Sequence, residues 1–113
     1  MHPDLAAATE RIVAMRARVA SLPDDGVPVQ EIEDVLCEGY AHALAGDAWL
    51  TRAEQRLHDL IDDTSLPIRG RDLRVLASEH GNFQRSVIAL RLELERLRRE
   101  HERAQAGSRA RSS

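Results

Sequence analysis

The chain has 113 residues, of which 42% are apolar and 31% are charged, and its formal net charge is −3. This length gives room for one hydrophobic core, and with only three aromatic residues that core must be largely aliphatic. A single cysteine excludes an internal disulfide bond and a cysteine-based zinc cluster, and no apolar run approaches the roughly 18 to 20 residues of a membrane span. We therefore expect a soluble, cytoplasmic domain without membrane contact.

The first apolar stripe predicts a helix over residues 3–22. Its members recur at alternating intervals of three and four residues, which places them on one helical face: Leu5, Ala8, Ile12, Met15, Val19 and Leu22. Pro23 ends this helix because the residue before a proline is disfavoured in the α conformation. Asp24, Asp25 and Gly26 then favour a turn.

A second stripe predicts a long helix over residues 28–64. Pro28 suits the first position of a helix, and acidic residues follow it near the positive end of the helix dipole. Residues 65–70 contain a serine, a proline and a glycine, which break the pattern. The stripe consists of Val29, Ile32, Leu36, Gly39, Ala43, Gly46, Leu50, Ala53, Leu57 and Leu60.

A third stripe predicts a helix over residues 70–104, and residues 105–113 lack apolar periodicity and are expected to form a disordered tail. The short connection makes the two long helices antiparallel. The expected fold is all-α, with a coiled-coil-like helical hairpin and a shorter N-terminal helix forming one elongated bundle over residues 1–104. The third stripe consists of Leu73, Leu76, His80, Phe83, Val87, Leu90, Leu94, Leu97, His101 and Ala104.

Small residues on the second stripe predict a close approach of the two long helices. Two registers of the hairpin fit the connection. In the first register Gly46 opposes Val87. Gly39 then opposes Leu94. In the second register the same glycines oppose Leu94 and His101, so that small residues face large ones in both. The close-packing set is Gly39, Ala43, Gly46 and Ala53.

Further apolar residues lie off the main stripes and predict a contact with a second copy of the chain. The narrow stripe of the first helix covers only part of this apolar surplus. We therefore expect a homodimer. The residues expected at its interface are Tyr40, Leu44, Trp49, Ile88 and Leu92.

Charge is distributed unevenly along the chain. Residues 1–67 contain 5 arginines and 13 acidic residues, whereas residues 68–113 contain 11 arginines and 6 acidic residues. We expect the acidic second helix to flank the basic third helix, as charged positions do in coiled coils. The alternative is a contact of the third helix and tail with nucleic acid or an acidic partner, through Arg96, Arg98, Arg99, Arg103, Arg109 and Arg111. Interleaved glutamates disfavour this alternative.

Histidines and acidic residues offer a weaker hypothesis of metal binding. Two pairs have a spacing of four residues, which also arises freely on polar helix faces: Glu38 with His42, and Glu54 with His58. We expect no metal and no other cofactor. His80 and His101 fall on the core stripe, where a neighbour is expected to accept a hydrogen bond; a pH-sensitive role is the alternative.

The function that this pattern favours is a non-enzymatic, self-associating module for protein–protein contacts, such as a scaffold, an adaptor or a small chaperone-like protein. The sequence does not identify the protein partner. Cys37 and the serines lack a motif that would activate a nucleophile. The alternatives are a nucleic-acid-associated regulatory module and, ranked last, a metal-binding bundle.

Overall fold

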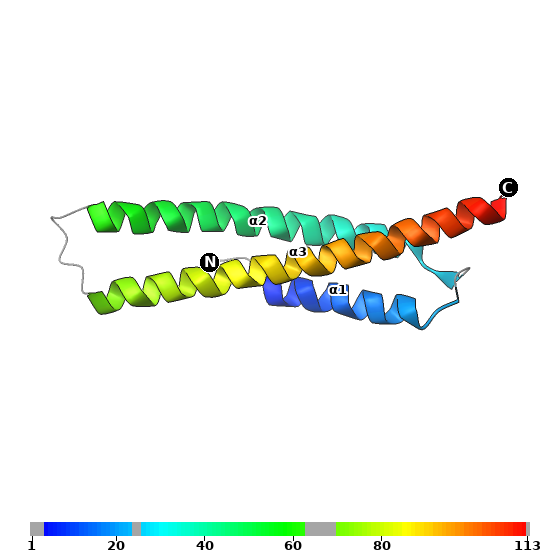
Figure 1. Ribbon diagram of the computed structural model, residues 1–113, viewed down its shortest axis with the longest axis horizontal. Coiled ribbons are helices and arrows are strands. Elements are labelled where there is room, and N and C mark those ends of the chain that lie inside the picture. Colours follow the sequence, from blue (N-terminus) through cyan, green and yellow to red (C-terminus); the bar gives the residue numbers. More distant parts are fainter. Residues whose placement is uncertain (1–3, 24–25, 63–69, 113) are drawn as a thin grey trace.

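The computed structural model describes residues 4–23, 26–62 and 70–112, which form an elongated three-helix bundle of 69 × 22 × 17 Å (Figure 1). The helices are α1 (Leu5–Ala20), α2 (Val29–Asp62) and α3 (Gly70–Ser112). The two long helices run side by side in opposite directions, and α1 lies against one half of them (Figure 1). The predicted all-α hairpin with a shorter N-terminal helix is confirmed, and the described ranges contain no strand.

Local capping sets the ends of α1. The Asp4 carboxylate accepts a hydrogen bond of 3.1 Å from the backbone N–H of Ala7, which satisfies one free donor of the first turn. At the other end the Ser21 hydroxyl donates to the carbonyl of Arg18 at 2.8 Å, and α1 stops two residues before the predicted end. The expected turn at Asp24 and Asp25, and the connection over residues 63–69, lie outside the described residues.

The C-terminal end of α3 differs from the sequence prediction. We expected a disordered tail from residue 105, but the helix continues to Ser112. Alanine and arginine are frequent in this segment and are among the best helix formers. Ala104 and Gly107 also line a groove together with Leu22 and Val27 of the chain between α1 and α2.

The hydrophobic core is confined to the half of the hairpin that α1 covers. Its buried members are Leu5, Ala8, Ile12, Met15, Ile32, Leu36, Ala43, Phe83, Val87, Leu90, Leu94 and Leu97. Beyond Gly46 on α2, and before Phe83 on α3, no described residue is buried. We call residues 49–62 and 70–82 the two-helix arm; its apolar seam is only half-buried because α1 does not reach it.

Two glycines of α2 set the register of the bundle. A Cβ atom on Gly39 would lie 2.5 Å from Leu94 Cδ2 and 3.1 Å from Ile12 Cδ1. A Cβ atom on Gly46 would lie 3.0 Å from Val87 Cγ2. The first of the two sequence-derived registers is therefore confirmed. Ala43 is also buried between these glycines, whereas Ala53 is half-buried in the arm.

Replacing Gly46 with leucine should overpack the bundle. The added side chain meets the buried Val87 directly, so we expect a loss of roughly 1 to 3 kcal/mol in the free energy of unfolding. Thermal and urea unfolding followed by circular dichroism measure this loss.

Gly81→Ala is the matched control, because Arg85 Nη1, at 3.7 Å, is the nearest atom to a Cβ added there. Alanine is the better helix former, so this variant should gain about 1 kcal/mol. A Gly46→Leu protein that unfolds at the wild-type temperature would contradict the close approach.

Candidate functional site

Ion pairs hold α1 against both long helices. Arg16 is half-buried; its Nη1 atom lies 2.8 Å from Glu93 Oε2, and its Nε atom lies 3.2 Å from Glu100 Oε1. Partial burial lowers the pKa of Arg16, but the hydrogen bonds to the two glutamates outweigh this effect and raise the pKa overall. On the α2 side, Arg11 pairs with Glu38. These contacts position α1 on the two long helices.

A second set of polar contacts joins α2 to α3. His101 Nε2 lies 3.0 Å from Glu33 Oε1, which provides the hydrogen bond expected of a histidine on the core stripe. His80 Nε2 lies 3.3 Å from Glu54 Oε1, yet this buried nitrogen forms no hydrogen bond in the structure. Asp47 pairs with Arg91 between them. Acidic residues on α2 therefore face basic groups on α3, as the charge pattern predicted.

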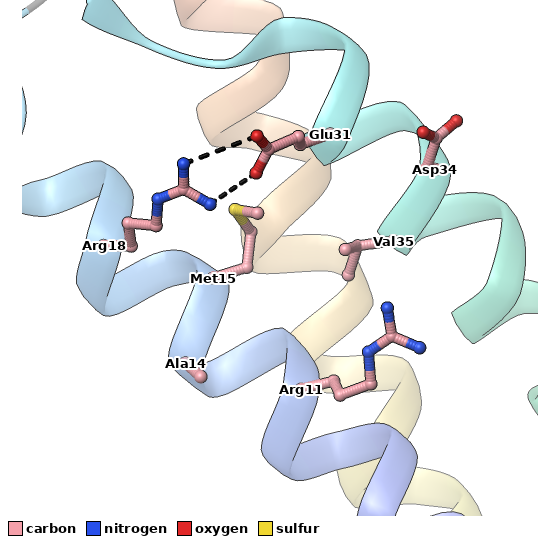
Figure 2. A pocket seen from close by; sticks show the side chains of 7 residues that line it. All are labelled: Arg11, Ala14, Met15, Arg18, Glu31, Asp34 and Val35. Atoms are coloured by element: carbon pink, nitrogen blue, oxygen red, sulfur yellow. Dashed lines mark hydrogen bonds and ion pairs between the residues drawn. The ribbon is translucent and has the colours of Figure 1, made fainter.

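An open groove of about 420 Å³ lies between α1 and α2, and Figure 2 shows the side chains that line it. The Arg18 guanidinium spans the groove and donates to both carboxylate oxygens of Glu31 (Figure 2). Arg11 is paired with Glu38, which lies outside the drawn set. Both arginines of this groove already have carboxylate partners, so the groove does not offer a free cationic site for a ligand.

The structure does not bring the four candidate metal ligands together. Glu38 pairs with Arg11, and Glu54 lies beside His80. His58 Nε2 lies 3.1 Å from Asp62 Oδ2 on the exposed side of the arm. His42 borders a small recess beside α1. Within residues 4–23, 26–62 and 70–112, no cluster of three or more His, Cys, Asp or Glu side chains is arranged to hold a metal ion.

Glutamates contact three of the six arginines considered for nucleic-acid binding. Arg98 Nη2 lies 2.7 Å from Glu95 Oε1, and Arg98 Nη1 lies 3.2 Å from Glu102 Oε1. The hydrogen bonds from Arg98 lower the pKa of Glu95, and the same contact raises the pKa of Arg98. Arg96 and Arg99 have glutamate partners as well. No continuous cationic strip is left along this part of α3, which gives the nucleic-acid alternative no specific support.

The feature that stands out is an apolar patch on the side of the long helices turned away from α1, which we call the outer face. Each residue of a helix turns the chain by about 100°, so Tyr40 lies about 200° round α2 from Glu38, which contacts α1. On α3, Ile88 lies about 140° from Glu93, which also contacts α1. Leu44 and Leu92 follow one turn later on their helices.

Four of the five predicted interface residues form this patch. The exposed fractions are 37% for Tyr40, 66% for Leu44, 60% for Ile88 and 50% for Leu92. The register places all four within a few residues of the same level of the bundle. The exposed thiol of Cys37 lies on the same side of α2, one turn from Tyr40.

Trp49, the fifth predicted interface residue, lies elsewhere. Its ring packs on that of Phe83, with centroids 4.3 Å apart and planes inclined at 43°. Trp49 is half-buried against the core just beyond the end of α1. It also lies about 140° round α2 from Leu44, so it does not share the outer face with the other four residues. The apolar residues of this segment thus serve two different sides of the helix.

No family model, no curated protein and no solved structure matches this chain. Among the described residues, no helix combines the length and the apolar character needed to cross a bilayer.

Replacing Trp49 with alanine should weaken folding because the variant loses the stacking on Phe83. Trp49 is half-buried, so we expect a loss of about 1.5 to 3 kcal/mol, below the roughly 3 to 5 kcal/mol of a fully buried aromatic residue. Urea unfolding gives this value. Val75→Ala is the matched control and should cost less, because Val75 is 49% exposed in the arm; an equal or larger loss from Val75→Ala would contradict the placement of Trp49 at the core.

Proposed function

We propose that this protein is a non-enzymatic interaction module, of the scaffold or adaptor kind, that self-associates through the outer face of α2 and α3. The observation that carries the proposal is the apolar patch of Tyr40, Leu44, Ile88 and Leu92. A cluster of exposed large apolar residues is typical of a protein-interaction site.

The patch contributes a substantial part of the free energy that association needs. Burying one aliphatic side chain contributes roughly 1.5 to 3 kcal/mol. Leu44, Ile88 and Leu92 are at least half exposed, and Tyr40 is 37% exposed. A two-fold contact would bury all four side chains in both copies. Their combined contribution is comparable with the cost of association, which is about 4 to 15 kcal/mol.

The polar contacts support a structural rather than a catalytic role for the charged residues. Arg16, Asp47 and Glu33 each join one helix to another. Such pairs fix helix positions and do not leave a nucleophile beside a base. The exposed free thiol of Cys37 supports a reducing compartment, such as the cytoplasm, as the place where the module acts.

Light scattering on a sizing column tests the proposal. The wild-type chain of 12.6 kDa should elute with twice that mass. Leu44→Glu and Ile88→Glu place a charge in the patch and should give folded monomers, with helical circular dichroism retained, because burying an unpaired carboxylate opposes association.

Val75→Glu is the matched control. Val75 is 49% exposed and lies in the arm, about 140° round α3 from Ile88. This variant should stay dimeric. A monomeric wild-type protein would refute self-association, and a dimer broken by Val75→Glu but not by Leu44→Glu would place the contact on the arm instead.

A further inference from the structure

We propose that two copies associate in parallel, about a two-fold axis that runs along the bundle, so that α2 of each copy lies on α3 of the other. This inference rests on the self-association proposed above and specifies its geometry. The occupant of the outer face is thus a second copy of this chain, in one defined orientation.

A two-fold contact between the outer faces has two possible orientations. If the axis runs along the helices, the acidic helix of one copy meets the basic helix of the other. If the axis runs across the helices, α2 meets α2 and α3 meets α3. Helix α2 has eight acidic residues and two arginines, whereas α3 has ten arginines and six acidic residues. The crossed orientation therefore opposes helices of like charge, which disfavours association.

The register gives the levels at which residues of the two copies meet. Gly39 faces Leu94 and Gly46 faces Val87, so that each step forward on α2 matches one step backward on α3. A two-fold axis along the bundle leaves the level of every residue unchanged. Residues at one level within the chain are therefore also at one level between copies.

Under this rule, apolar residues of the two copies lie at nearly the same levels along the bundle. The level of Tyr40 on α2 is that of residue 93 on α3, one position from Leu92. The level of Leu44 is that of residue 89, one position from Ile88. One position along a helix is about 1.5 Å, which side chains bridge easily. Each apolar residue of one copy thus meets an apolar residue of the other.

On both sides of the patch, acidic residues of α2 in one copy also lie near the levels of arginines of α3 in the other copy. Asp47, which pairs with Arg91 of its own chain and keeps 46% of its side chain exposed, lies at the level of residue 86, one position from the exposed Arg85. Asp59 lies at the level of Arg74, and these two are exposed too. Glu33, which contacts His101 of its own chain, lies at the level of Glu100, one position from Arg99. The level of Asp59 and Arg74 thus provides the clearest match of an exposed acidic residue with an exposed arginine.

The crossed orientation provides fewer favourable charge pairs between the two copies. With the axis at the centre of the patch, between Tyr40 and Leu44, Glu33 falls opposite Thr51 and Asp47 falls opposite Cys37. The apolar residues still meet, but neither of these two carboxylates faces a cationic residue of the other copy. Charge complementarity therefore selects the parallel orientation, although the apolar patch alone does not.

Spin-label distances in the full chain test the orientation. Ile61 lies near the end of α2 and is 61% exposed. In an Ile61→Cys, Cys37→Ser protein, the parallel dimer brings the two labels to one level, within about 15 to 30 Å across neighbouring helices. The crossed dimer separates them by roughly 55 to 60 Å along the axis. Light scattering on the labelled protein establishes whether it is a dimer.

A charge exchange gives a second, independent readout. Asp59→Arg and Arg74→Glu should each weaken the dimer by about three- to tenfold in Kd, as exposed ion pairs do. The double variant Asp59→Arg, Arg74→Glu should restore the wild-type Kd, because it exchanges the two charges between facing positions. Circular dichroism of all three variants separates a weaker dimer from a less stable fold.

The outcomes distinguish the two proposals. A short label distance with rescue by the double variant supports the parallel orientation. A dimer with labels 55 to 60 Å apart, or without rescue, overturns this orientation and leaves self-association intact. A monomeric mass without any label coupling refutes self-association and the orientation together.

Discussion

The close approach at Gly39 and Gly46 is the constraint on which the rest of the structure depends. At these two positions α3 presents Leu94 and Val87 to the backbone of α2, and α1 presents Ile12 beside the first of them. A larger residue would separate the helices, because the facing side chains belong to a buried core with little room to move. The two glycines lie one heptad apart and therefore fix the register as well as the spacing. Every interhelical contact in the bundle follows from that register.

Charge is sorted between the long helices in a way that this register makes effective. Asp47 reaches Arg91, and Glu33 reaches His101, because the antiparallel alignment brings acidic positions of α2 to basic positions of α3. Such exposed pairs contribute little to stability individually. Their value lies in specificity, because a shifted hairpin would lose them and would place like charges together. The same sorting continues on the outer face, where it supports the parallel orientation proposed for a second copy.

The short length of α1 divides the molecule into two parts with different surfaces. Where α1 packs, three helices enclose a buried core, and Arg16 ties α1 to two glutamates of α3. Beyond Gly46 the two long helices continue as the arm, whose apolar seam is only half-buried apart from the stacking of Trp49 on Phe83. Because α1 occupies one side of the hairpin, the outer face is left without a covering helix. This asymmetry, rather than any reactive group, is the basis for the proposed role in protein contacts.

The sequence by itself determined the helical class, the three stripes and the small residues at the close approach, because these depend on the 3.6-residue period and on side-chain size. It left two registers open, since the heptad-like stripe permits a shift of one repeat, and only the packing of Gly39 against Leu94 selected between them. It also grouped Trp49 with Tyr40 as interface residues, although the two lie on different sides of α2, because a one-dimensional pattern shows what leaves the stripe and not which neighbour covers it. The helical end of α3 differs from the sequence prediction for a related reason: weak apolar periodicity does not reveal a segment in which alanine and arginine favour a helix. The position of α1, and with it the outer face, is a property of the tertiary structure alone.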